Sequence, residues 1–139
     1  MSQGQLLSKK KNRMEIITAK LGLFGQAIAK VTPPCLMLMV QGNVFAITLD
    51  HWMTAFKTAG IVGLILVILS FSVRTKEIRD NAYSMAGLVA IVTAIVDFNV
   101  HASHYSGVTT EALMTGLCAG LLWLAVSFTP LGKLGQGND

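Results

Sequence analysis

The basic residues of this chain are confined to short segments that alternate with long apolar runs. All of its 11 lysines and arginines except Lys57 lie in residues 9–30, in residues 74–79 or at position 133. The apolar runs between these segments approach 20 residues, the length that a helix needs to cross the hydrocarbon core of a bilayer. With 13% charged residues, the chain of 139 residues has about half the charged share of a soluble domain. The sequence therefore predicts an all-α integral membrane protein of one domain.

Four transmembrane helices are predicted within residues 31–129. Their bounds are about residues 31–49, 53–73, 82–101 and 112–128. With four spans, both chain ends and the loop at residues 74–80 lie on one side of the membrane, which holds every basic residue except Lys57. Because basic loops stay in the cytoplasm, we expect an N-in/C-in orientation. The first span is the weakest, since it carries amide side chains near its middle that need partners away from lipid.

Polar and basic segments flank these spans. Residues 1–13 are predicted to form a disordered cytoplasmic tail, and residues 130–139 a second polar cytoplasmic tail. Residues 14–30 are predicted to form an amphipathic helix in the membrane interface, and a helix packed on a partner subunit is the alternative. Its apolar stripe recurs at spacings of three and four and consists of Met14, Ile17, Leu21, Phe24 and Ile28. The Thr-Pro-Pro sequence at residues 32–34 is expected to end this helix, because proline lacks a backbone donor.

Anionic lipid headgroups, and not nucleic acid, are the predicted partners of the basic residues, because these residues flank apolar spans. The residues assigned to headgroup contact are Lys9, Lys10, Lys11, Arg13, Lys20 and Lys30. The predicted location is the inner (plasma) membrane of a cell, and a virion membrane is the alternative.

One polar cluster has the chemistry of a site. At roughly 100° per residue, His101 lies about 40° from Asp97 and His104 about 20° on its other side, so all three share one face if the third helix continues that far. One carboxylate and two imidazoles suit a divalent metal or a proton relay. The alternative is interfacial capping, since histidines are favoured at a helix C-terminus. Asp97 lies about a turn inside the span, where a charge is costly unless it is paired or hydrated.

Small residues form ridges on two of the predicted spans. Gly116 and Gly120 form a GxxxG motif in the fourth span, and Ala86 and Ala90 form a similar ridge in the third. Such ridges let helix backbones approach closely, which gains dispersion contact where lipid offers no hydrophobic drive. Packing within one protomer and packing between protomers are both open. Because a four-helix unit of this size has little interior, we expect a homo-oligomer or an assembly with other membrane subunits.

No sequence motif in the chain indicates a particular enzymatic reaction. A nucleophile elbow, a P-loop, a dinucleotide fingerprint and an HExxH sequence are all absent, so we predict no enzymatic activity and no cofactor, with a divalent metal as the alternative. The general plan is similar to that of small four-span proteins such as drug exporters, phage holins and bacteriocin immunity proteins. The leading hypothesis is a structural, accessory or pore-forming subunit of an oligomeric assembly, holin-like or part of a virion membrane, of bacterial or phage origin. The alternative is a cation, metal or proton transporter that uses Asp97, His101 and His104.

Overall fold

Helices are the regular elements of the described chain. The computed structural model describes residues 2–38, 49–100 and 108–133. The helices are α1 (Gln3–Leu38), α2 (Leu49–Leu69), α3 (Arg74–Asp80), α4 (Ala82–Val100), α5 (Val108–Ser127) and α6 (Pro130–Lys133). No strand occurs in these three ranges, so the predicted all-α class is confirmed for them. The charged segment predicted as a loop between two spans forms the short helix α3.

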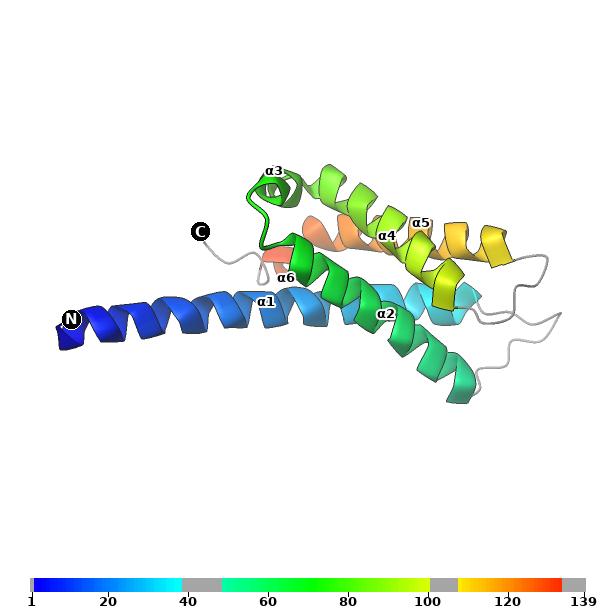
Figure 1. The fold of residues 1–139 in the computed structure, drawn as a ribbon. Coiled ribbons are helices and arrows are strands. Elements are labelled where there is room, and N and C mark those ends of the chain that lie inside the picture. The colour runs from blue at the N-terminus through cyan, green and yellow to red at the C-terminus, as the bar shows by residue number, and fades with distance from the viewer. Residues whose placement is uncertain (1, 39–48, 101–107, 134–139) are drawn as a thin grey trace.

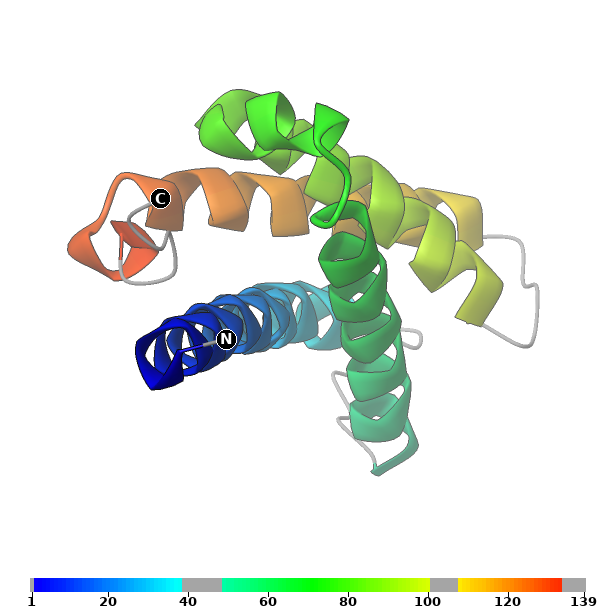
Figure 2. The ribbon, with the colours of Figure 1, turned by 60° about the vertical axis from the view of Figure 1, so that its left-hand side comes forward.

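Four of the helices, α1, α2, α4 and α5, pack around one apolar core (Figure 1). The closest pairs are α4 with α5 and α1 with α2, and further contacts between α2 and α4 and between α1 and α5 join the two pairs. The N-terminal half of α1 extends beyond the other helices (Figure 1). In the turned view α2 and α5 run in clearly different directions (Figure 2). The helices therefore cross one another, and the side chains at each crossing set how closely they approach.

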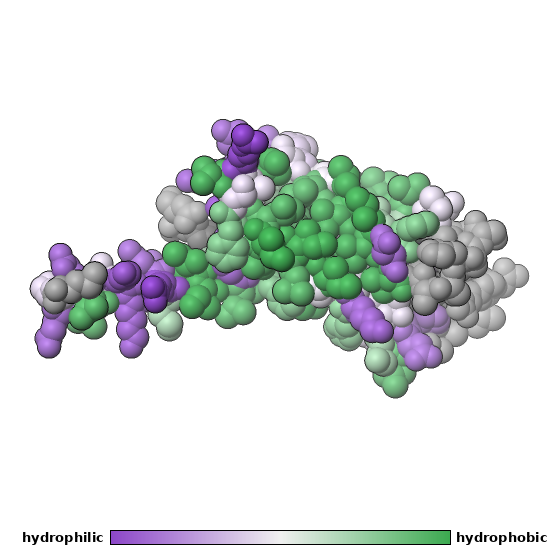
Figure 3. Space-filling view, in the orientation of Figure 1, coloured by the Kyte–Doolittle hydropathy of each residue, from purple (hydrophilic) through white to green (hydrophobic). Residues whose placement is uncertain are grey.

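Three of the described helices, α2, α4 and α5, are long and apolar enough to cross a membrane. Their outward faces carry large exposed apolar side chains, among them Leu64, Ile91 and Leu121. Apolar side chains cover the visible flank of the bundle, while polar ones gather at α3, on the N-terminal half of α1 and near the start of α2 (Figure 3). An apolar belt between polar ends is what a bilayer requires, and it gives the structure the character of a membrane protein.

The first helix differs from its prediction at both ends. It is continuous through both prolines to Leu38, so the end expected at residues 32–34 is wrong. The prolines remove the backbone hydrogen bonds to only two carbonyls of the preceding turn. The turn that follows them buries Cys35 and Leu36 in the core, and this packing offsets the loss. At the other end α1 begins at Gln3, so the tail that was expected to be disordered is an exposed helix.

The C-terminal half of α1 packs inside the bundle. Ala27 and Val31 are fully buried, and the Phe24 ring lies against Gly63 of α2. Within residues 14–30, therefore, the part from Phe24 onward is a bundle helix and not an interfacial one. The first predicted span has only residues 31–38 in common with α1, and its residues 39–48 lie outside the described part of the chain.

Lys20 ties α1 to the end of α2. Its ammonium donates to the Ser70 carbonyl oxygen at 3.1 Å and to the Ser70 hydroxyl at 2.6 Å. It also lies 4.8 Å from the centroid of the Phe71 ring. Residues 3–19 of α1, which precede Lys20, are all exposed and belong to the N-terminal half that extends beyond the bundle.

Candidate functional site

A buried carboxylate lies where α4 meets α1 and α2. The Asp97 side chain is 1% exposed. Its Oδ1 atom accepts hydrogen bonds from the Thr58 hydroxyl of α2 at 3.4 Å and from the Cys35 thiol of α1 at 3.7 Å. We call these three residues the Asp97 cluster. Asp97 was singled out from the sequence, whereas Thr58 and Cys35 were not selected as polar site residues, because no local pattern links them to an acid so far along the chain.

Three more threonine hydroxyls are buried in the same bundle. Thr93 lies one turn before Asp97 on α4, Thr32 lies about one turn before Cys35 on α1, and Thr115 lies on α5. Within the described residues, none of these three hydroxyls has a hydrogen-bond partner. Buried polar atoms without a protein partner are rare, and they need water or a bound ion to satisfy them. Together with Thr58, they give each of the four bundle helices one buried hydroxyl.

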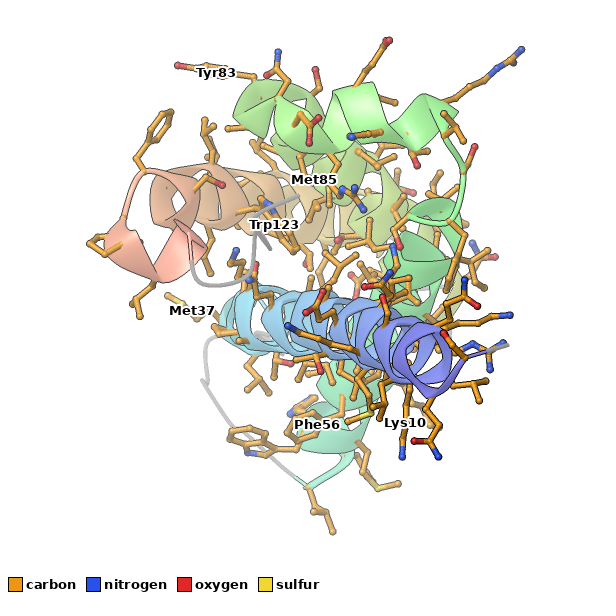
Figure 4. The ribbon with its side chains drawn as sticks, turned by 90° about the vertical axis from the view of Figure 1, so that its left-hand side faces the viewer. Lys10, Met37, Phe56, Tyr83, Met85 and Trp123 are labelled. Carbon is orange, nitrogen blue, oxygen red and sulfur yellow. The ribbon has the colours of Figure 1, made fainter. Side chains whose placement is uncertain are left out.

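A second ionisable side chain, Lys30 of α1, is buried with 6% of its surface exposed. Its ammonium donates to Gln26 Oε1 at 3.0 Å and lies 4.0 Å from the centroid of the Trp123 ring on α5. Trp123 points from α5 toward α1 (Figure 4). Among the described residues no carboxylate lies within ion-pair distance of this ammonium. A cation over an aromatic face gains electrostatic stabilisation when it is desolvated, and here the ring takes part of the role of a counter-charge.

The burial of Lys30 corrects its assignment to lipid headgroups. Lys30 lies between Ala27 and Val31, which are fully buried, so its side chain starts from the core-facing side of α1. Lys9, Lys10, Lys11 and Arg13 are exposed on the extended part of α1, where headgroup contact stays a prediction. The signal that could have found Lys30 is the i, i+4 spacing to Gln26, which places an amide acceptor on the same face.

The small residues predicted for helix packing meet at the crossing of α4 and α5. A methyl group added at Gly116 would contact the Ala90 carbonyl oxygen and would lie 2.8 Å from Ala94 Cβ. One added at Gly120 would lie 2.7 Å from the Ala86 carbonyl oxygen and 2.8 Å from Ala90 Cβ. The ridges therefore pack within the protomer. They hold α4, which carries Asp97, against α5.

The two histidines predicted to share a face with Asp97 lie outside the described residues. His101 and His104 follow the end of α4 at Val100, so the proposed face stays a prediction. Within the described ranges, no group of three His, Cys, Asp or Glu side chains is placed to hold a metal ion.

The cluster offers oxygen atoms to a bound cation. A carboxylate and neighbouring hydroxyls are hard ligands that suit a proton or a small hard cation. A charged carboxylate at this depth in an apolar bundle is energetically costly, so a cation bound to Asp97 would lower that cost by neutralising the charge. The arrangement is therefore chemically able to bind and release one positive charge.

Comparison of the chain with protein-family models, with curated proteins and with solved structures finds no match.

Proposed function

We propose that this chain is a small multi-pass membrane protein that binds a proton or a small monovalent cation at Asp97 and carries it across the membrane. One observation supports the proposal most: an aspartate with 1% exposure lies inside a bundle of apolar helices and accepts hydrogen bonds from Thr58 and Cys35. Carboxylates at such depth are rare and commonly belong to ion pathways or proton relays.

The buried hydroxyls support the same function. Thr32, Thr93 and Thr115 have no acceptor or donor among the described residues, so water or a cation that enters the bundle would give them partners. Their distribution over α1, α4 and α5 provides polar positions along more than one side of the interior. In such an interior a cation exchanges its water ligands for protein hydroxyls, which lowers the cost of leaving water.

Lys30 would limit the interior to one bound cation. It lies five residues before Cys35 on α1, which is roughly 7.5 Å along the helix axis at about 1.5 Å per residue. A positive charge on Lys30 would repel a second cation inside the same bundle, because charges interact strongly in a medium of low dielectric constant.

We propose a topology in which α2, α4 and α5 cross the membrane and the C-terminal half of α1 forms a fourth crossing, with both chain ends in the cytoplasm. The basic residues support this orientation, because seven of the 11 lysines and arginines lie on α3 or on the extended part of α1. Figure 1 supports it too, since α3, α6 and the N-terminal half of α1 lie at the same end of the bundle. Reporter fusions at the two termini test this topology, and opposite compartments for the two ends would contradict it.

The transport proposal is tested with the purified full-length chain in liposomes. A pH-sensitive dye inside the vesicles reports proton uptake, and separate sodium and potassium gradients report monovalent cations. We expect Asp97→Asn to reduce uptake to the level of empty liposomes. The matched control is Asp50→Asn, since Asp50 is an exposed acid at the start of α2. Wild-type uptake in a correctly folded Asp97→Asn protein would remove this function.

A second candidate function rests on a different part of the chain. The N-terminal half of α1 extends beyond the bundle and exposes apolar side chains, among them Leu7, Met14 and Ile17, beside its lysines. An exposed helix of this kind favours a structural, accessory or pore-forming subunit of a membrane assembly, holin-like or part of a virion membrane. Cross-linking of a Met14→Cys variant in native membranes tests it, and a species that remains monomeric at every concentration would contradict it.

A further inference from the structure

A pocket lies at the end of the bundle where α1, α2, α3 and α4 meet. Its walls are apolar and come from Leu23, Leu66, Leu69, Met85 and Leu88. The pocket and its mouth hold about 240 Å³ of empty space. Most of this space belongs to the open mouth, because the enclosed part has room for only about one group of the size of a water molecule. The pocket is therefore a shallow apolar depression that an acyl chain of the bilayer can lie against and that a folded segment of protein cannot enter.

The edge of the pocket is polar and positively charged. Ser70, Thr75 and Arg79 complete its lining. The Lys20 ammonium lies at the same edge, because it donates to the Ser70 hydroxyl at 2.6 Å and to the Ser70 carbonyl oxygen at 3.1 Å. The lining of the pocket thus includes a guanidinium from α3, and an ammonium from α1 contacts Ser70, the lining residue directly after α2.

We propose that this pocket binds one anionic phospholipid of the surrounding bilayer. Part of an acyl chain would lie along the five apolar side chains, and the phosphate would contact Arg79 and Lys20. Guanidinium groups bind phosphate through paired hydrogen bonds, and lysine adds a point charge. The pocket lies beside α3 at the basic end of the helices, and basic residues at a membrane surface attract anionic lipids. This inference does not depend on cation transport, since no residue of the Asp97 cluster lines the pocket.

The chain contains its own control for general charge attraction. Arg74 and Lys76 lie on α3 with Arg79 and are exposed, but they do not line the pocket. Each Arg79→Gln and Arg74→Gln variant loses one positive charge from the same helix. A difference between the two variants therefore reports the site and not the net charge.

Native mass spectrometry of the full-length protein in detergent, with phosphatidylglycerol or phosphatidylcholine added, tests the proposal. We expect the wild-type protein to retain phosphatidylglycerol at least about tenfold better than phosphatidylcholine, because the choline ammonium of phosphatidylcholine offsets its phosphate charge and is repelled by Arg79 and Lys20. Arg79→Gln and Lys20→Gln should each lower this preference severalfold, whereas Arg74→Gln should keep it. Equal losses for Arg79→Gln and Arg74→Gln, or equal retention of both lipids by the wild type, would overturn the proposal.

The acyl part of the site has a separate variant. Leu69→Trp covers the apolar depression without changing any charge, and we expect it to lower retention of phosphatidylglycerol severalfold. Unchanged retention would show that the lipid does not enter the pocket, which contradicts the proposal as well. Circular dichroism of each variant checks that its helices are intact. Should Arg79→Gln fail to fold, Lys20→Gln still decides the headgroup contact.

Discussion

Replacing Gly116 or Gly120 by alanine should weaken the contact between α4 and α5 more than a glycine-to-alanine change elsewhere in the described helices. The added methyl group at Gly116 would contact the Ala90 carbonyl oxygen and would lie 2.8 Å from Ala94 Cβ and 3.0 Å from the Ala94 backbone nitrogen. None of these atoms belongs to a side chain that can rotate away. The two helices must therefore move apart.

The size of the effect follows from these distances. Carbon atoms prefer separations of about 3.5–4.0 Å, so the contact at 2.8 Å requires a shift of roughly 1 Å. Overpacking of this kind costs typically about 1–3 kcal/mol. Alanine returns up to about 1 kcal/mol through its higher helix propensity. We expect a net loss of roughly 1–2 kcal/mol in the free energy of unfolding.

The matched control is Gly87→Ala on α4, because a methyl group there meets no atom within 4 Å. This variant should be neutral or should gain about 0.5–1 kcal/mol. The two variants make the same chemical change, so most of the propensity effect cancels and their difference reports the packing. Reversible unfolding in mixed micelles, followed by tryptophan fluorescence and circular dichroism, measures both. Equal stability of the two variants would refute the close contact, and loss of an oligomer without loss of protomer stability would place the ridge between protomers.

Two further substitutions test the buried polar groups. Thr93→Val should raise the free energy of unfolding by about 1–3 kcal/mol, because it removes a buried hydroxyl that has no partner among the described residues. The same variant should lower cation uptake in liposomes. A stabilised variant with full uptake would mean that this hydroxyl has no part in transport. Lys30→Met keeps a flexible side chain against Trp123 but removes a buried ammonium, so we expect stability to rise by at least about 1 kcal/mol. The exposed Lys57→Met is its control, and a Lys30→Met protein less stable than that control would show that the ammonium is a net stabilising group.

The helical class and three apolar helices could be predicted from the sequence because they depend on local properties. Hydropathy over a window of about 20 residues identified the segments that became α2, α4 and α5. The cap of α4 is also local, because the Asn81 side-chain oxygen accepts from the backbone nitrogens of Tyr83 and Ser84 at 3.0 and 3.3 Å. Such features involve residues within a few positions of each other, so no knowledge of the fold is needed to recognise them.

The first helix shows where local rules fail. Two adjacent prolines are a strong stop signal in an isolated helix, and the prediction followed that rule. In the folded chain the turn after the prolines buries Cys35 and Leu36, and this packing continues the helix to Leu38. The same packing places Lys30 in the interior, although its sequence neighbourhood resembles the basic edge of a membrane helix.

Length, hydropathy and the distribution of charge by themselves determined that this protein is helical, that α2, α4 and α5 suit a bilayer, and that Asp97 needs a special environment. Only the tertiary structure decided which groups provide that environment. Thr58 and Cys35 are brought to Asp97 from other helices, and the ridge of Gly116 and Gly120 is used inside the protomer. The physical reason is that helix periodicity fixes which residues share a face, whereas the choice of the face that meets each neighbour depends on how all four helices pack together.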